Sequence, residues 1–74
     1  MLDALAAVAR EARIAAELTQ LDIATAAGTN HATISRFEGG RRWPLDPDRI
    51  IRAYEIECGL SEGELWKRAA AKLG

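Results

Sequence analysis

Apolar residues recur along this chain at helical spacing, three and four positions apart, in five short segments. The first segment runs from about Leu2 to Glu17 and places Leu5, Val8, Ala12 and Ala16 on one face. No stretch alternates apolar and polar residues with the β-branched or aromatic enrichment that is typical of strands. The pattern therefore predicts an all-α fold.

Capping residues set the expected bounds of the second and third helices. Thr19 and Asp22 have the spacing of a reciprocal capping box, so the second helix is expected to begin there. Gly28 is expected to take the left-handed conformation that ends this helix. Asn30 then precedes residues 31–38, which are predicted to form a short third helix with Asn30 as its N-cap.

Two further start signals predict the fourth and fifth helices. Asp46 followed by Pro47 fits a helix start, because proline is well tolerated at the first helical position. Ser61 and Glu64 repeat the capping-box spacing, which predicts that the fifth helix begins at this box. Five short helices joined by tight turns are therefore expected.

Tryptophan and leucine residues in the last third of the chain have alternative interpretations. Leu65 and Ala69 are expected to seal the core, whereas Trp66 and Leu73 extend the same apolar strip. The extension either completes the core or forms an exposed patch suited to a homodimer contact. Trp43 is expected to cap the core between two helices, and packing at the edge of a DNA site is its alternative role.

Composition and charge narrow the function classes. The 74 residues, 49% hydrophobic with fifteen alanines, fit one small domain over residues 1–74. The net charge is −1, yet residues 28–43 hold three arginines and one glutamate, so an anionic partner is expected to meet that segment unless it is only a solvated face. One cysteine and one histidine argue against a disulfide or a structural metal site. No cofactor, metal or small-molecule ligand is expected, and the lack of a signal or membrane segment predicts a cytoplasmic protein.

The predicted third helix has two different faces. Ile34 and Phe37 lie on its inner side at helical spacing. The opposite, small and polar side carries His31, Ala32, Ser35 and Arg36. Such a face suits the major groove of DNA, where a guanidinium binds guanine, polar side chains bond base edges and an alanine contacts a thymine methyl. A plain solvent-exposed face is the alternative, but the tight turn from the preceding helix favours a helix-turn-helix.

The stretch that carries these features reads LTQLDIATAAGTNHATISRFEGGRRWP. It resembles the Cro/lambda-repressor-type helix-turn-helix family, also called XRE, through its LTQ opening, glycine corner and ISR-aromatic-Glu-Gly helix. The resemblance covers roughly residues 9–64 and implies a compact five-helix, lambda-repressor-like DNA-binding domain. Its helix-turn-helix would span about residues 19–38.

The resemblance also implies roles for individual residues. The family's base-reading positions correspond to His31, Ala32 and Arg36. Its backbone-contacting positions correspond to Gln20, Asn30, Thr33, Arg41 and Arg42. Arg13 and Glu38 stand where the family often has a partly buried ion pair. One departure is Glu17, which replaces the usual glycine and would cost about 1 kcal/mol if it keeps the left-handed conformation.

Taken together, these features predict a sequence-specific transcriptional regulator of phage-repressor type, in a bacterial cell and encoded there or by a phage. A homodimer is expected to place two recognition helices on a pseudo-palindromic operator. Two other classes fit the same residues: the antitoxin of a toxin–antitoxin pair, and a protein-interaction module that has lost DNA binding. An enzyme is not expected, since nothing places a nucleophile and an orienting acid beside His31.

Overall fold

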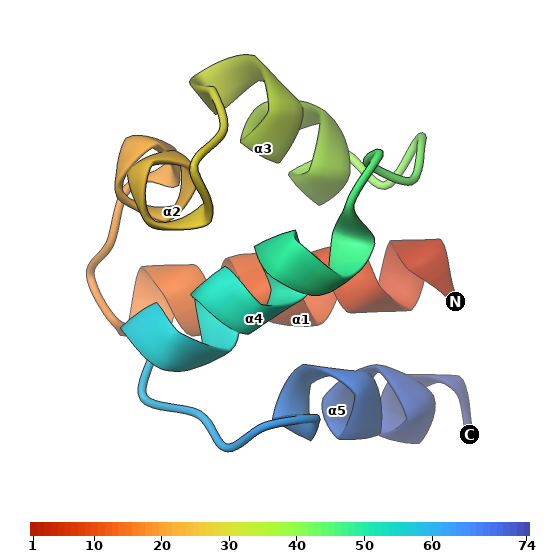
Figure 1. The fold of residues 1–74 in the computed structure, drawn as a ribbon. Helices are drawn as coiled ribbons and strands as arrows, with labels where there is room; N and C mark the ends of the chain where they lie inside the picture. The colour runs from red at the N-terminus through yellow and green to blue at the C-terminus, as the bar shows by residue number, and fades with distance from the viewer.

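The computed structural model describes all 74 residues and contains five α-helices joined by short turns (Figure 1). In chain order the helices are α1 (Leu2–Ala15), α2 (Gln20–Ala27), α3 (His31–Glu38), α4 (Pro47–Glu57) and α5 (Glu64–Leu73). No residue lies in a strand, so the predicted all-α class is confirmed. None of the helices has the length and apolar character needed to cross a bilayer.

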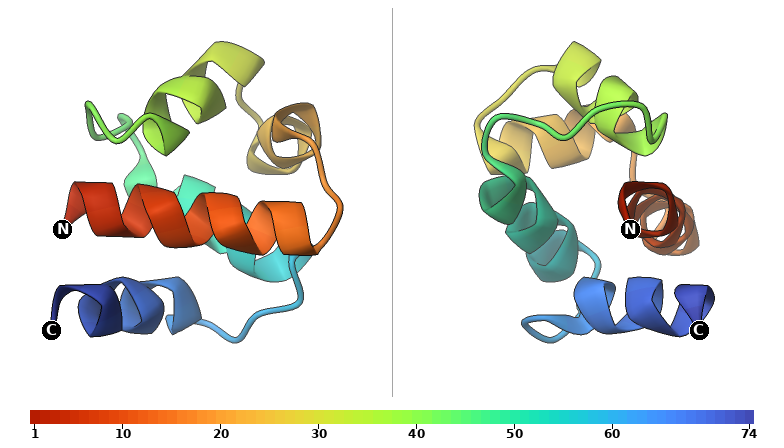
Figure 2. Two further views of the ribbon diagram at one scale, coloured as in Figure 1. Left: turned by 180° about the vertical axis from the view of Figure 1, so that it is seen from behind. Right: turned by 90° about the vertical axis from the view of Figure 1, so that its right-hand side faces the viewer.

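The helices are arranged in three levels (Figures 1 and 2). α1 and α4 run through the middle of the molecule, α2 and α3 cover one side, and α5 covers the opposite side. The two chain termini lie near each other at one end. As a result α3 stands at the edge farthest from α5.

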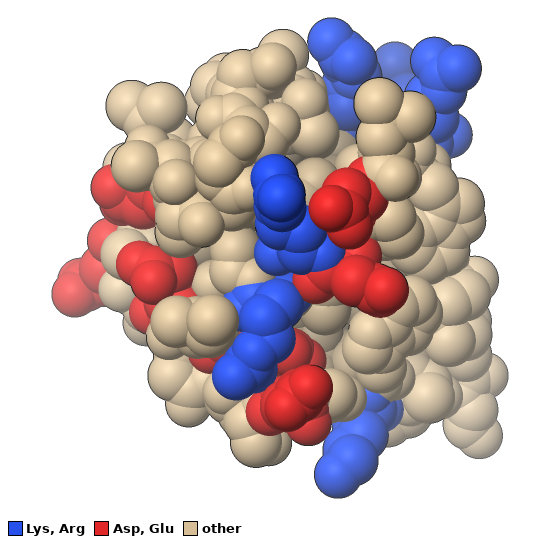
Figure 3. Space-filling model, in the orientation of Figure 1, with Lys and Arg blue, Asp and Glu red and all other residues tan.

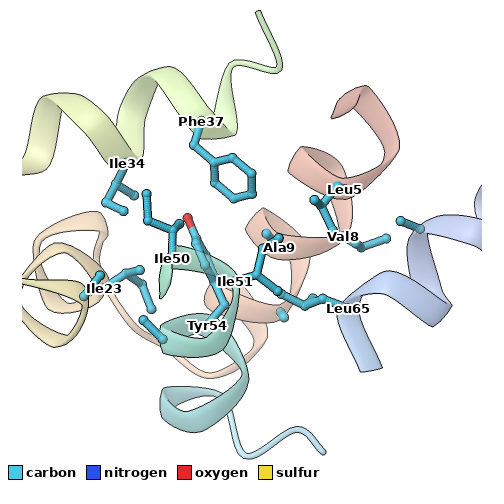
Figure 4. Packing of buried hydrophobic residues seen from close by; sticks show 14 of the residues in the cluster. Leu5, Val8, Ala9, Ile23, Ile34, Phe37, Ile50, Ile51, Tyr54 and Leu65 are labelled. Carbon is cyan, nitrogen blue, oxygen red and sulfur yellow. The ribbon is translucent and has the colours of Figure 1, made fainter. Parts of the chain in front are cut away.

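All five helices contribute to one cluster of sixteen buried residues, part of which is shown in Figure 4. The predicted inner residues Leu5, Val8 and Ala12 are all buried there. Ile34 and Phe37 are completely buried, so the inner face of α3 anchors this helix to the rest of the molecule. Leu65 and Ala69 seal the other side of the core, as predicted.

Hydrogen bonds at the helix starts confirm three of the predicted caps. The Thr19 hydroxyl accepts from the Asp22 N–H at 3.0 Å, and the Asp22 carboxylate accepts from the Thr19 N–H at 2.8 Å. The Asn30 side chain accepts from the Thr33 N–H at 2.9 Å. Asp46 caps α4 in the same way, with Pro47 at the first helical position.

The end of α1 differs from the prediction. The helix ends at Ala15 rather than at Glu17, and Ala16 lies just beyond it, partly buried but outside the helix. Glu17 has a φ of 59°, in the left-handed region. The Leu18 N–H then donates to the Arg13 carbonyl at 3.1 Å, closing the helix end in the manner usually provided by glycine.

The predicted start of α5 is wrong by two residues, because the N-cap is Gly63 and not Ser61. Gly63, with a φ of 85°, precedes a helix that begins at Glu64. Half of the expected capping box forms, because the Glu64 carboxylate accepts from the Ser61 N–H at 3.0 Å. The Ser61 hydroxyl donates to that carboxylate instead of capping the helix. The acceptor for the Leu65 N–H is the buried carboxylate of Glu55, on α4, at 3.3 Å.

Trp43 does not join the buried core, contrary to expectation. Its side chain is 44% exposed, and its ring stacks on that of Trp66 with the centroids 6.1 Å apart and the planes 22° from parallel. Such a stack favours a fixed geometry between the two rings. It therefore ties the connection between α3 and α4 to the start of α5.

Candidate nucleic-acid interface

The turn between α2 and α3 fixes the angle of two short helices. Gly28 has a φ of 68°, a conformation that glycine takes without steric cost. The Thr29 N–H donates to the Ala24 carbonyl at 2.9 Å, which closes the end of α2. Asn30 then starts α3. The glycine conformation, the hydrogen bond that closes α2 and the cap of α3 together shape the helix-turn-helix bend.

The outer face of α3 is free of the protein core. The four residues on this face are all solvent-exposed: His31, Ala32, Ser35 and Arg36. Thr33 lies at the side of the helix, where its hydroxyl donates to the Asn30 side chain at 3.1 Å. The predicted base-reading face is thus available to a partner. At its edge, the Asn30 side chain and the Thr33 hydroxyl are already hydrogen-bonded to each other.

Basic side chains gather at the C-terminal end of α3. Arg36, Arg41 and Arg42 are exposed and form no ion pair. In Figure 3, Lys and Arg side chains cluster at the upper right, over the end of α3 and the α3–α4 connection. Acidic side chains lie on the side of α2 and, mixed with basic ones, across the middle of the same face. The protein therefore has a local positive surface although its net charge is only −1.

This positive surface contains a polar hollow of about 520 Å³. It is lined by Ser35, Arg36, Gly39, Arg41 and Arg42. Guanidinium groups and a hydroxyl are suited to bind phosphate oxygens through charge-assisted hydrogen bonds. The hollow lies beside the outer face of α3, so one anionic chain can contact both.

Behind α3, the Glu38 carboxylate joins Arg13 in a bidentate ion pair. Arg13 Nε lies 2.7 Å from Glu38 Oε2, and Arg13 Nη2 lies 2.8 Å from Oε1. The two side chains are only 12% and 3% exposed. The remaining Arg13 Nη1 donates to the Leu18 carbonyl at 2.9 Å. The pair links α1 to the last turn of α3.

Two further side chains complete this network. The Tyr54 hydroxyl donates to Glu38 Oε2 at 2.5 Å, and the Gln20 amide donates to Oε1 at 3.1 Å. Sequence reasoning missed Tyr54; the available signal was a tyrosine in the apolar stripe of α4, since a buried hydroxyl needs a partner. Gln20, expected at the DNA backbone, has one amide hydrogen engaged with the protein itself.

The network also shifts pKa values. Burial opposes ionisation of Glu38, but the hydrogen bonds from Arg13, Tyr54 and Gln20 outweigh it and hold the pKa of this carboxyl below its usual value. The ionised carboxylate thus stabilises the fold above its unfolded-state pKa, and this stabilisation is lost as the pH falls through the folded-state pKa. Burial and the bond to Glu38 raise the pKa of the Tyr54 hydroxyl, which stays protonated.

A helix-turn-helix with an exposed polar second helix and a flanking basic surface defines the class of DNA-binding helix-turn-helix domains. A family model described as "Helix-turn-helix domain" matches residues 4–66. The chain therefore belongs to this family, which is of the XRE/Cro-like type, in agreement with the resemblance seen in the sequence. Comparisons with curated proteins and with solved structures gave no match. Family membership points to DNA binding and to a role in transcription regulation.

Proposed function

We propose that this protein is a sequence-specific transcriptional repressor that occupies operator DNA with α3 in the major groove. The observation that carries the proposal is the exposed outer face of α3, formed by His31, Ala32, Ser35 and Arg36. In this role Arg36 binds a guanine edge, His31 and Ser35 bond other base edges, and Ala32 contacts a thymine methyl.

The flanking residues hold the DNA backbone in this proposal. Arg41 and Arg42 lie on the positive surface beyond the C-terminal end of α3, and Gln20 lies at the start of α2 on the other flank. Asn30 and Thr33 stand at the leading end of α3. Contacts on both flanks set the register of the helix in the groove without reading the sequence.

Two copies of the protein bind a pseudo-palindromic operator, with half-sites about 34 Å apart along one face of the DNA. The longest dimension of the protein is 32 Å, so neighbouring copies at this spacing can touch when that dimension lies along the DNA. Blocking promoter DNA by occupancy gives repression. Because the net charge is −1, we expect the affinity for random DNA to be low. Discrimination between DNA sequences then depends on the α3 face.

Selection from a random DNA library with the purified protein tests this function. The expected result is a palindromic consensus whose half-site centres are one helical turn apart, together with a complex mass that corresponds to two protein copies. Recovery of no enriched sequence would overturn the proposal and favour a protein-interaction module.

Arg36→Ala tests the reading face on the selected operator. We expect the affinity to fall by about 1–3 kcal/mol and the preference to relax at one base pair, because one bidentate guanine contact is lost. Lys67→Ala is the matched control: it also removes one positive charge, but from an exposed site on α5 without an ion pair. An equal loss of affinity on every DNA sequence would make Arg36 a backbone contact instead.

A further inference from the structure

A cleft with an apolar base lies between α3, the α3–α4 connection and the start of α4. Its volume is about 420 Å³, within the range of about 300–1,000 Å³ that is usual for small-molecule sites. Phe37 and Ile50 are buried in the core and form the base of the cleft. Its other apolar lining comes from Ala27, Pro44 and Leu45. We refer to this concavity as the α3–α4 cleft.

Two residues of this lining keep apolar surface that the protein does not cover. The Leu45 side chain is completely exposed. Trp43 also remains partly exposed, although its ring stacks on that of Trp66. Apolar surface of this kind favours any partner that removes it from water. The α3–α4 cleft therefore suits a ligand with an apolar body.

The charged groups of the α3–α4 cleft favour an anionic group on that ligand. Arg36 and Arg42 line the cleft, and neither forms an ion pair within the protein. Arg49 lines it as well, but its Nε lies 3.6 Å from the carboxylate of Asp46, the only acidic group in the lining. The attraction for an anion thus comes from Arg36 and Arg42. A guanidinium binds a carboxylate through two parallel hydrogen bonds.

We propose that the α3–α4 cleft binds a small carboxylic acid with an apolar body. The carboxylate of the ligand pairs with Arg36 and Arg42 at the rim, and the apolar body lies on Phe37, Ile50 and Leu45. A single negative charge matches this site, because the apolar base offers no cation to a second one. No small-molecule ligand was expected from the sequence, since the cleft forms only where three segments pack together.

The ligand and operator DNA compete for the same guanidinium. This part of the inference rests on the proposed function, in which Arg36 reads a guanine. Arg36 lies on the exposed outer face of α3 and also lines the α3–α4 cleft. A guanidinium that pairs with the ligand is not available to a base. The acid therefore acts as an inducer, which releases the repressor from its operator.

Tryptophan fluorescence tests the site without DNA. Trp66→Phe leaves Trp43, which lines the cleft, as the only tryptophan. The probes are octanoate, cyclohexanecarboxylate and 3-phenylpropionate, each compared with its uncharged amide and with acetate at the same ionic strength. A saturable change is expected with at least one acid, and none with the amides or acetate. No saturable change with any acid would overturn the site, and an equal response to the amides would overturn the pairing with the arginines.

Exposed residues of the cleft can be changed without removing a contact of the core, and matched variants lie on α5. Arg42→Ala should weaken binding of the acid by about tenfold or more, because one charge-assisted contact is lost. Lys67→Ala removes the same charge from an exposed site on α5 and should have no effect. Leu45→Ala should also weaken binding, whereas Leu73→Ala should not. Equal effects within either pair would overturn the assignment to the cleft.

Release of DNA tests the regulatory part separately. At ten times its dissociation constant, the acid should lower the apparent operator affinity of the wild type about elevenfold, as expected for competition. Leu45→Ala should bind the operator as the wild type does but require more acid for release. An operator complex unchanged by saturating acid would overturn the inducer role and leave the site. A protein that binds the acid but selects no operator would overturn the proposed function instead.

Discussion

At the scale of single residues, the Glu38 carboxylate has the largest set of partners in the molecule. Side chains from three other helices donate to it: Arg13 from α1, Gln20 from α2 and Tyr54 from α4. Glu38 itself ends α3. One ionised group therefore fixes α3 relative to most of the fold. Its loss is expected to change the position of α3 at the candidate interface and to lower the stability of the protein.

Arg13→Ala is expected to lower the free energy of unfolding by about 3–5 kcal/mol, because it leaves a buried carboxylate without its cation. Arg68→Ala breaks the exposed pair with Glu64 and should cost less than about 1 kcal/mol. Urea unfolding of the two variants measures the difference. Equal losses would mean that the Arg13–Glu38 pair behaves as a surface pair despite its burial.

A second residue-scale prediction concerns Glu17, the one non-glycine residue with a positive φ. Glu17→Gly should raise the free energy of unfolding by about 1 kcal/mol, because glycine takes the left-handed conformation without the clash of a Cβ. Glu17→Ala serves as the control: it removes the same charge but keeps the Cβ, so no gain is expected. A similar gain in both variants would assign the effect to the charge rather than to the backbone.

At the scale of elements, local signals predicted most helix boundaries. The end of α1 lies two residues before the predicted one. The start of α5 was missed because a distant residue supplied the partner. The caps at Thr19, Asn30 and Asp46 act within three residues, so the sequence is sufficient to find them. The start of α5 depends instead on Glu55, ten residues away on α4. A capping-box spacing at Ser61 cannot show that a buried carboxylate elsewhere accepts the helix N–H.

The Trp43–Trp66 stack connects two elements with different roles. It fixes the α3–α4 connection, which carries Arg41 and Arg42, to α5 on the far side of the core. Trp66→Ala should therefore weaken DNA binding without touching DNA, with a stability loss of about 0.5–1.5 kcal/mol beyond the lost burial. Affinity for a single half-site, where a dimer contact contributes nothing, measures the effect. Leu73→Ala on the same helix is the control and should leave that affinity unchanged.

Should Trp66→Ala bind a half-site as well as the wild type does, the connection holds its arginines without the stack. A conservative Trp66→Phe change should recover most of the affinity, because a ring remains in place to pack on Trp43. This rescue distinguishes a positioning role from a general loss of stability. If stability alone mattered, both substitutions would lower the affinity in proportion to the side-chain area that each removes.

At the scale of the whole molecule, the sequence predicted which residues of α3 face outward. It did not predict which residues from different helices contact each other. The exposed side of α3 follows from helical periodicity around Ile34 and Phe37, and the structure agrees. The approach of α4 to the turn before α3 could not be predicted in this way. Arg49 meets the turn at Gly28 only because α4 packs against α2, and that contact depends on the entire core. The DNA roles of the residues on the exposed side of α3 remain predictions.

Operator spacing gives the prediction that involves the whole molecule. Two proteins with their 32 Å dimension along the DNA and recognition helices about 34 Å apart are expected to touch when they occupy adjacent half-sites on one face of the DNA. Inserting five base pairs turns one half-site by about half a helical turn, and inserting ten restores the facing but doubles the separation to about 68 Å. Cooperative binding should be lost in both cases, leaving the affinity of a single half-site. Changing the central bases without changing their number should preserve cooperativity, and gel-shift titrations compare all four operators. Equal affinity for every spacing would mean that the copies bind independently, and the exposed Trp66 and Leu73 would then have no part in assembly on DNA.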